Sequence, residues 1–214
     1  MDATVSVSTV EEVGPDTYAI RFSTPDGFTA EPGQFVKLGT EIDGESVARF
    51  YTLSSPSTTD TFEVTVGIDL DEGGEFSRFL ADLEPGTEME LSGPYGDDHY
   101  AGEERAVVLA GGPGIGAAVA IAEAAIESGN EAALVYRDDE PAHEARIGAL
   151  RENGVTVHLL AGDADLTEPV ADVITGTTGE TAFVYGFADF VADAEAAIEA
   201  AGGDAETAKV ENFG

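Results

Sequence analysis

The sequence of 214 residues contains no cysteine. This absence excludes disulfide bonds, thiolate zinc sites and cysteine-held iron–sulfur clusters within the chain. Any redox chemistry would therefore need an organic cofactor or an external partner. Histidine is nearly as scarce, and His99, His143 and His158 show no spacing that suits metal ligands. We expect no metal site, and we interpret the three histidines as surface or strand residues.

Long apolar runs are also missing. No stretch approaches the roughly 18 uninterrupted apolar residues that a membrane-spanning helix requires. The opening segment MDATVSVSTVEEV lacks the basic end and the apolar run of a signal peptide. We therefore expect a soluble, cytoplasmic protein without membrane insertion.

Basic residues are scarce as well: 9 Lys and Arg face 43 Asp and Glu, which gives a net charge of −34. Such an imbalance can indicate disorder, but the apolar content of 43% and the regular hydrophobic periods indicate a packed chain. Self-repulsion destabilises a compact state in dilute buffer, whereas molar salt shortens the Debye length to about 3 Å. We therefore interpret the protein as halophilic, and we exclude nucleic acid as a partner because its phosphates would be repelled.

The first half of the chain is rich in strand patterns. Alternating, β-branched runs are separated by turn signals such as Pro25-Asp26-Gly27. The expected strands are Thr4–Val10, Tyr18–Phe22, Gln34–Leu38 and Thr61–Gly67. One helical pattern, at Phe76–Leu83, interrupts them. Strands at this spacing predict an antiparallel barrel or sandwich.

The second half alternates strand and helix patterns. The expected strands are Ala106–Ala110, Ala132–Tyr136, Val155–Leu160 and Ala182–Tyr185. The expected helices are Ala117–Ser128, Glu140–Glu152, Leu166–Thr175 and Ala188–Ala201. Continuous apolar strands separated by helices indicate a parallel sheet covered on both faces. We predict a multi-domain α+β protein, with an antiparallel β-barrel over residues 1–100 and a Rossmann-like α/β domain with a parallel sheet over residues 101–214.

A glycine-rich turn follows the first strand of the second half. Residues 107–117 read VVLAGGPGIGA, so an apolar strand enters a turn that contains Gly111, Gly112, Gly114 and Gly116. Glycines let backbone N–H groups approach a pyrophosphate, and the following helix N-terminus adds partial positive charge. Tight strand–helix turns also collect glycine for steric reasons. The strand before the turn and the helix after it favour phosphate binding.

Two segments of the first half suggest a second binding site. Arg49, Tyr51 and Thr52 place a cation, an aromatic ring and a hydroxyl together at a strand end, which suits a planar anionic cofactor. The alternative is a surface arginine paired with carboxylates beside a core tyrosine. Residues 73–77, GGEFS, open the helix of this half, so free N–H donors and the Ser77 hydroxyl would face an anion. The alternative there is a plain N-terminal cap.

These segments, in this order, resemble the ferredoxin–NADP reductase-like flavoproteins. The family's Arg-x-Tyr-Ser/Thr signature matches residues 49–52, and its Gly-Gly-x-x-Ser matches residues 73–77. Its Gly-Pro-x-Gly matches residues 93–96, its nucleotide loop matches residues 111–116, and its C-terminal Glu-x-aromatic matches residues 211–213. The resemblance spans nearly the whole chain. It implies that the barrel binds FAD and that the α/β domain binds NAD(P).

The resemblance also implies roles for individual residues. Arg49 would bind a flavin phosphate, Tyr51 would stack on the isoalloxazine, and Thr52 would hydrogen-bond near flavin N5, so Tyr51 and Thr52 are the expected catalytic residues. Ser77 would hold the pyrophosphate, and Phe213 would cover the opposite flavin face. The implied cofactor-binding residues are Arg49, Phe50, Tyr51, Thr52, Gly73, Gly74, Ser77, Gly111, Gly112, Gly114, Gly116, Arg137 and Phe213.

The nicotinamide side departs from the family pattern. Pro113 stands where the family usually has Thr, and residues 185–187, YGF, stand where many members have Cys-Gly-Pro. Arg137 suits the 2′-phosphate of NADP, whereas the acidic residues after it suit the ribose hydroxyls of NADH. Both NADH and NADPH therefore stay open as co-substrate, with a lean to NADH.

The implied function is hydride transfer between NAD(P)H and bound FAD, with FMN a less fitting alternative to FAD. Electrons would pass to a small acidic protein such as a ferredoxin, to another iron–sulfur or haem component, or to a small-molecule acceptor. Any iron–sulfur centre would belong to another protein, because the chain has no cysteine. The alternative is a non-catalytic dinucleotide-binding or electron-transfer subunit of a larger redox complex.

Overall fold

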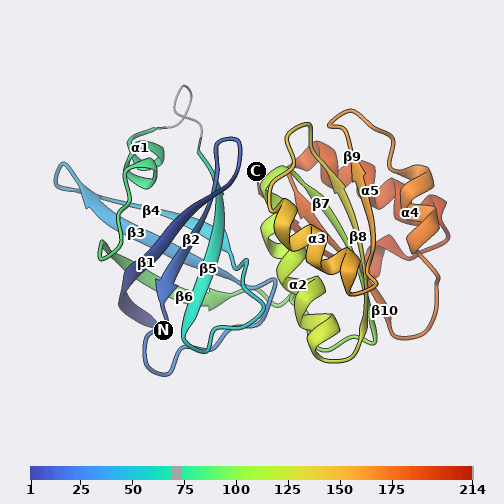
Figure 1. Ribbon diagram of the computed structural model, residues 1–214, viewed down its shortest axis with the longest axis horizontal. Helices are drawn as coiled ribbons and strands as arrows, with labels where there is room; N and C mark the ends of the chain where they lie inside the picture. Colours follow the sequence, from blue (N-terminus) through green and yellow to red (C-terminus); the bar gives the residue numbers. More distant parts are fainter. Residues whose placement is uncertain (69–73, 214) are drawn as a thin grey trace.

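The computed structural model describes residues 1–68 and 74–213. It contains two sheets that lie side by side, one in each half of the chain (Figure 1). The first sheet is antiparallel and the second is parallel, so the predicted fold class is confirmed. No helix among the described residues is long and apolar enough to cross a membrane.

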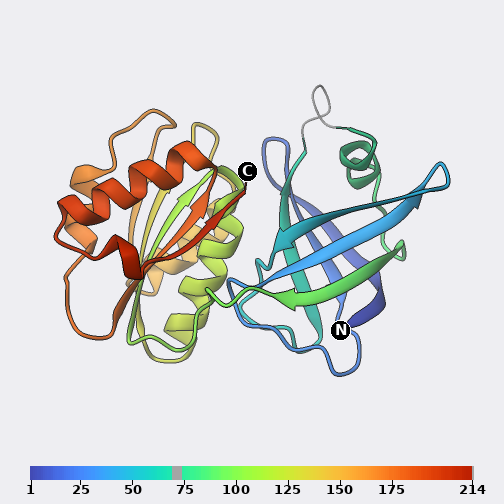
Figure 2. The ribbon, with the colours of Figure 1, turned by 180° about the vertical axis from the view of Figure 1, so that it is seen from behind.

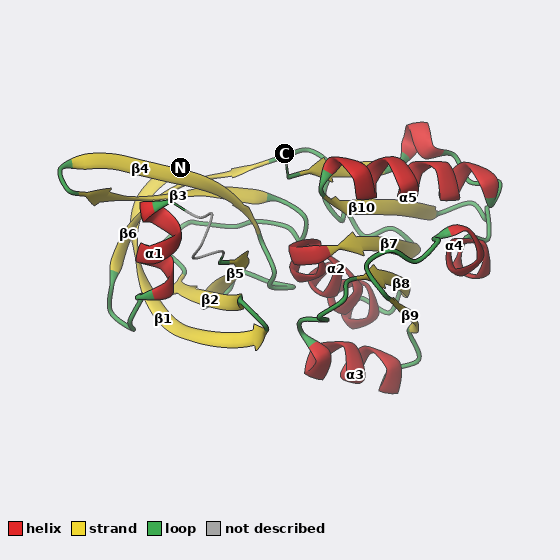
Figure 3. Ribbon diagram, turned by 90° about the horizontal axis from the view of Figure 1, so that it is seen from above, coloured by secondary structure: helices red, strands yellow, loops and turns green. Residues whose placement is uncertain are grey.

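The first sheet has six strands in the order β4-β3-β6-β1-β2-β5. The strands are β1 Asp2–Gly14, β2 Thr17–Ser23, β3 Phe35–Ile42, β4 Glu45–Thr52, β5 Thr61–Gly67 and β6 Glu88–Tyr95. The chain continues from β4 to Leu53, which forms an antiparallel bridge with Val64 of β5. This bridge joins the two edges of the sheet, so the sheet curls into the barrel seen from above in Figure 3.

The barrel interior is aromatic and aliphatic. Phe22 and Phe62 stack with ring centroids 5.2 Å apart, and Phe28 packs against Phe62. Helix α1, Glu75–Ala81, buries Phe76 and Leu80 against this core. The helix that the apolar spacing predicted is therefore present, although it ends at Ala81.

The second sheet has five strands in the order β11-β10-β7-β8-β9. Its elements are β7 Arg105–Gly111, η1 Gly112–Gly114, α2 Ile115–Glu127, β8 Glu131–Arg137, α3 Glu144–Glu152, β9 Thr156–Leu160, α4 Thr167–Val173, β10 Glu180–Gly186, α5 Ala188–Ala200, η2 Ala205–Thr207 and β11 Lys209–Asn212. Helices α2 and α3 pack into one buried cluster, while α4 and α5 pack into another. The sheet is therefore covered on both faces, as its apolar strands predicted (Figure 1).

Two features of this half were not anticipated. Strand β11 adds a parallel edge strand beside β10 and carries the C-terminal segment to the boundary between the two halves (Figure 2). Helix α3 begins at Glu144 and not at Glu140, because Pro141 and the left-handed backbone of His143 (φ 57°) precede it.

The interpretation of His143 as a surface or strand residue was also wrong. Its side chain is only 4% exposed, and its Nε2 lies 2.8 Å from the Thr65 hydroxyl of the barrel. Burial lowers the pKa of His143 to about 3, helped by the charges of Arg146 and Arg21. The imidazole is therefore neutral and forms part of the contact between the halves.

Candidate functional site

A cavity of about 490 Å³ lies where the barrel, the N-terminal end of α2 and the C-terminal strand meet. The barrel contributes the ends of β4 and β5 and the Ser77 turn of α1. The second half contributes Pro113 and Ala117 of the glycine-rich turn and helix, and the residues around β11. The lining residues are Phe50, Tyr51, Thr52, Thr65, Val66, Gly67, Ser77, Leu80, Pro113, Ala117, Phe187, Glu211, Asn212 and Phe213.

A second cavity, of about 480 Å³, continues from the first along the barrel surface. Phe50, Tyr51 and Ser77 line both cavities. Arg49 and Gly74 line only the second. The predicted residues of the first half therefore gather around one extended groove, except Gly73, which lies outside the described residues.

Arg49 lies on β4 and lines the second cavity. It donates to the carbonyl oxygen of its neighbour Ala48, at 2.8 Å, and lies 6.0 Å from the centre of the Phe76 ring. Among residues 1–68 and 74–213, no carboxylate lies within ion-pair distance of it. The role of Arg49 as an anion ligand therefore stays a prediction. In a chain of net charge −34, a cation beside a cavity suits an anionic ligand.

Tyr51 and Thr52 point to different partners, because neighbouring residues of a strand face opposite sides. Tyr51 packs against the barrel core, and burial raises its pKa well above the usual range despite the charge of Arg49. The phenol is therefore neutral. Thr52 donates a hydrogen bond of 2.9 Å to Oε2 of Glu211.

Glu211 is a site residue that sequence reasoning did not assign, although residues 211–213 contributed to the resemblance. Strand β11 brings it across the boundary between the halves to the end of β4. Burial raises its pKa to about 7, while the Thr52 hydrogen bond opposes the rise. This carboxyl therefore gains and loses a proton near neutral pH. The Glu-x-aromatic pattern was the one signal that could have identified it.

The four glycines of the turn at residues 111–116 are needed there for different structural reasons. A Cβ on Gly111 would lie 2.5 Å from the Phe190 ring, and one on Gly114 would lie 2.2 Å from the Tyr185 carbonyl oxygen. A Cβ on Gly116 would lie 2.4 Å from the Thr65 hydroxyl oxygen. The steric alternative therefore explains these three glycines.

Gly112 is the exception in this turn. Its φ is +55°, which disfavours any side chain, and a Cβ there would meet nothing within 4 Å. It stands at the start of η1, directly after β7. This is the position in the turn where a ligand phosphate has room to approach.

Arg137 lies at the C-terminal end of β8 and already has partners. Its NH1 is 2.9 Å from Oδ2 of Asp193, and its guanidinium lies 5.0 Å from the centre of the Phe190 ring. A 2′-phosphate at this position would have to compete with Asp193. The role of Arg137 in nucleotide choice stays a prediction.

Aromatic side chains enclose the cavity on the nucleotide side. Phe213 contacts Phe187 edge to face, with ring centroids 6.0 Å apart, and Phe187 is 53% exposed. Tyr185, which stands in place of the family's cysteine, is buried and points to the Asp98 carbonyl oxygen, away from the cavity. Phe187 and Phe213 therefore line this side of the cavity, whereas Tyr185 does not.

The residues present fit a flavin dinucleotide. Rings and aliphatic groups line the interdomain cavity, which suits a planar heterocycle, and an arginine and the Ser77 hydroxyl line the adjoining groove, which suits phosphates. The closed barrel, the parallel sheet and the cavity between them define a two-domain flavin reductase fold.

Comparisons with known proteins agree with this class. Residues 4–100 match the oxidoreductase FAD-binding domain family. One relative is the ferredoxin reductase component of 3-ketosteroid-9-alpha-monooxygenase from Mycolicibacterium smegmatis. The two sequences are 30% identical over 98% of this chain and 65% of that relative. A ferredoxin NADP+ reductase from Neisseria gonorrhoeae, solved with bound FAD and NADP, superposes with a TM-score of 0.81 at 18% identity, over 99% of this chain and 98% of that one.

The chain is therefore similar to oxidoreductase FAD-binding domains over residues 4–100 and has, over nearly its whole length, the fold of a ferredoxin NADP+ reductase. Its match to the glycine betaine monooxygenase reductase subunit of Chromohalobacter salexigens is 38% identical over 46% of this chain and 27% of that relative. The chain thus spans about a third or less of the length of the first curated relatives that it matches.

Proposed function

We propose that this chain is a reductase that takes hydride from NADH or NADPH onto bound FAD and passes the electrons to a separate acceptor. The observation that carries the proposal is the cavity lined by both halves, whose lining includes the hydrogen-bonded pair Thr52 and Glu211. A site built from both halves suits a reaction between two cofactors, one held by each half.

Each half supplies one set of binding groups. On the barrel side, Arg49 and Ser77 would hold the flavin phosphates, and Tyr51 would pack against the isoalloxazine. On the other side, Gly112 would admit the nucleotide pyrophosphate. The family match, which ends at residue 100, supports a division into binding units at residues 1–100 and 101–214.

The flavin supplies the hydride chemistry when it is bound. The residues of this chain orient and shield the reaction. Phe187 and Phe213 cover the cavity and limit water, and the Phe213 ring would have to yield when nicotinamide enters. Glu211, with its pKa near 7, holds a proton at its carboxyl and exchanges it through the Thr52 hydroxyl. This arrangement keeps charge in the cavity balanced as the electron count changes.

The acceptor would be another protein or a small molecule. Relatives named as reductase components of oxygenases support a protein acceptor. We propose a ferredoxin as the specific acceptor. An iron–sulfur centre would have to come from that partner, because the chain has no cysteine. The net charge of −34 favours a working environment of high salt, in which two acidic proteins can approach one another.

The test is anaerobic reduction in molar KCl. The purified protein is expected to be yellow, to release FAD on denaturation, and to lose its flavin absorbance when NADH or NADPH is added. A colourless protein that FAD does not reconstitute would contradict the proposal. A yellow protein that neither nucleotide reduces would instead favour a non-catalytic electron-transfer subunit.

A further inference from the structure

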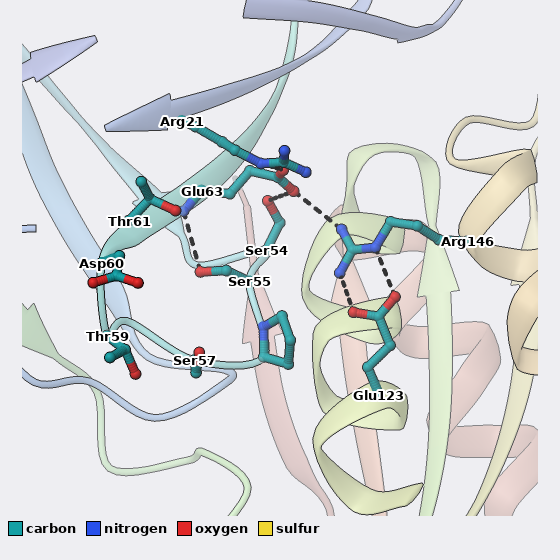
Figure 4. Close-up of a pocket in the computed structure, with 11 residues that line it drawn as sticks. Arg21, Ser54, Ser55, Ser57, Thr59, Asp60, Thr61, Glu63, Glu123 and Arg146 are labelled. Atoms are coloured by element: carbon teal, nitrogen blue, oxygen red, sulfur yellow. Dashed lines mark hydrogen bonds and ion pairs between the residues drawn. The ribbon is translucent and has the colours of Figure 1, made fainter. Parts of the chain in front are cut away.

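A polar cluster outside the cofactor cavity joins the two halves. Arg146 of α3 donates from Nε and NH2 to both carboxylate oxygens of Glu123 of α2, at 2.8 and 2.6 Å. Its NH1 donates to Oε1 of Glu63 of β5, at 3.0 Å. Figure 4 shows the guanidinium between the two carboxylates, one from each half. We call Glu63, Arg146 and Glu123 the interdomain clamp.

The barrel end of the clamp is firmly held. The Glu63 side chain is only 4% exposed, and it also accepts hydrogen bonds from Ser54 Oγ at 2.9 Å and Arg21 Nε at 2.8 Å. Burial by itself would lower the pKa of Arg146, but the hydrogen bonds and charges of Glu123 and Glu63 raise it. A partly buried, bidentate arrangement of this kind sets a defined geometry and is screened less by salt than a pair in open solvent.

The clamp joins two elements that both line the cavity. Strand β5 carries Glu63 and, two residues on, Thr65, which lines the cavity. Helix α2 carries Glu123 and, six residues earlier, Ala117, which also lines the cavity. At about 1.5 Å per helical residue and 3.3 Å per strand residue, the clamp lies roughly 10 Å or less along each element from the cavity.

We propose that Arg146 is a positioning residue for hydride transfer: by clamping β5 to α2 it sets the separation of the cavity walls that hold the two cofactors. This inference rests on the proposed function. Arg146 touches neither cavity, so it acts through Glu63 and Glu123. A shift of about 1 Å between reacting groups costs up to about a hundredfold in rate.

The experiment compares Arg146→Met with Arg151→Met in the full-length flavoprotein. Arg151 lies on the same helix and is exposed, and its guanidinium makes no hydrogen bond or ion pair among the residues that the structure describes, so its variant is matched in charge and side-chain length. Arg146→Met should keep its FAD and undergo photochemical flavin reduction as the unmodified protein does. Its rate of reduction at saturating NADH or NADPH should fall roughly tenfold or more, with the nucleotide KM unchanged.

Arg146→Lys should recover part of the rate, because an ammonium can still contact a carboxylate but cannot bridge both sides. Full activity of Arg146→Met, or an equal loss in Arg151→Met, would overturn the proposal. If Arg146→Met does not fold, Glu123→Gln takes its place with the same expectation, since it weakens the bridge from the second half.

Small-angle X-ray scattering separates the failure of this inference from the failure of the proposed function. Arg146→Met should show a broader distribution of interatomic distances than the unmodified protein and Arg151→Met, because the halves are no longer clamped. If no nucleotide reduces the unmodified protein, the proposed function fails. Unchanged scattering in Arg146→Met overturns the clamp itself.

Discussion

The hydroxyl of Thr52 donates a 2.9 Å hydrogen bond to Glu211, a residue 159 positions further along the chain. The bond joins the end of β4 to β11 and therefore the barrel to the α/β half. Because the carboxyl is buried, its ionisation is coupled both to folding and to the state of the cavity. The first prediction concerns this coupling.

Replacing Glu211 by Gln should remove a pH-dependent contribution to stability. The pKa of Glu211 is raised by burial from 4.5 to about 7 in the folded chain. The folded state thus binds the proton more tightly than the unfolded state, and this contribution is fully present below pH 4.5 and lost as pH rises to about 7. Between pH 4.5 and about 7, the free energy of unfolding of the unmodified protein should fall relative to that of Glu211→Gln. Above about pH 7 the difference between the two should stay constant.

Chemical denaturation at a series of pH values, in constant molar salt, measures this difference. Glu199→Gln on α5 is the control, because Glu199 is exposed and its substitution removes the same formal charge. A difference between Glu211→Gln and the unmodified protein that does not vary with pH would contradict the raised pKa.

Replacing Arg49 by Ala should weaken flavin binding. A charge-assisted hydrogen bond to phosphate contributes about 1.5–3 kcal/mol, so affinity should fall at least roughly tenfold. The measurement is the ratio of flavin to protein after gel filtration, followed by titration of the apoprotein with FAD. Arg78→Ala, an exposed arginine of α1 outside both cavities, removes the same charge and should retain flavin. Equal flavin content in the two variants would argue against a phosphate contact of Arg49.

Replacing Gly112 by Val should leave flavin bound but impair reduction by the nucleotide. The side chain would project into the open space at the turn and exclude the pyrophosphate. Gly129→Val is the matched control, because Gly129 also has positive φ (+78°) and open space but lies at the far end of α2. Both variants should lose roughly 1–2 kcal/mol of stability from the left-handed backbone, yet only Gly112→Val should raise the nucleotide KM.

Replacing Gly116 by Ala should loosen the contact between the halves. The added Cβ would lie 2.4 Å from the Thr65 hydroxyl oxygen, and overpacking of this kind costs about 1–3 kcal/mol. Gly148→Ala in α3 should have the opposite effect on stability. A Cβ on Gly148 would meet nothing within 4 Å, and replacing a helical glycine by alanine stabilises the folded state by roughly 0.5–1 kcal/mol. Thermal unfolding should show opposite shifts of Tm. A stabilised Gly116→Ala would mean that the two halves do not pack this closely.

Salt should stabilise the unmodified protein. The Debye length falls from about 10 Å at 0.1 M to about 3 Å at 1 M, which relieves the repulsion from a net charge of −34. Each kcal/mol relieved should raise Tm by roughly 2–4 °C for a chain of this size. Thermal unfolding in increasing KCl measures the effect, with sucrose as an uncharged stabilising control. A Tm that responds to sucrose but not to KCl would contradict adaptation to salt.

Local patterns predicted most of the architecture. The alternation in Thr61–Gly67 and the apolar run in Ala106–Ala110 are set by nearest neighbours and burial, so both strands lie where the pattern placed them. Strand β11 escaped prediction because it is short and half-buried, and it depends on pairing with β10. His143 escaped because its burial comes from the facing barrel and not from its own helix.

The site residues likewise divide into those that the sequence predicted and those that only the tertiary structure brought together. The sequence alone determined the net charge, the exclusion of cysteine chemistry, the fold class and the grouping of Arg49, Tyr51 and Thr52, because each depends on composition or on residues a few positions apart. Only the tertiary structure decided that Glu211 meets Thr52, that Gly116 serves packing while Gly112 faces open space, and that Arg146 bridges the halves. These relationships join residues far apart in the chain, and burial and close approach arise only when the two halves pack together.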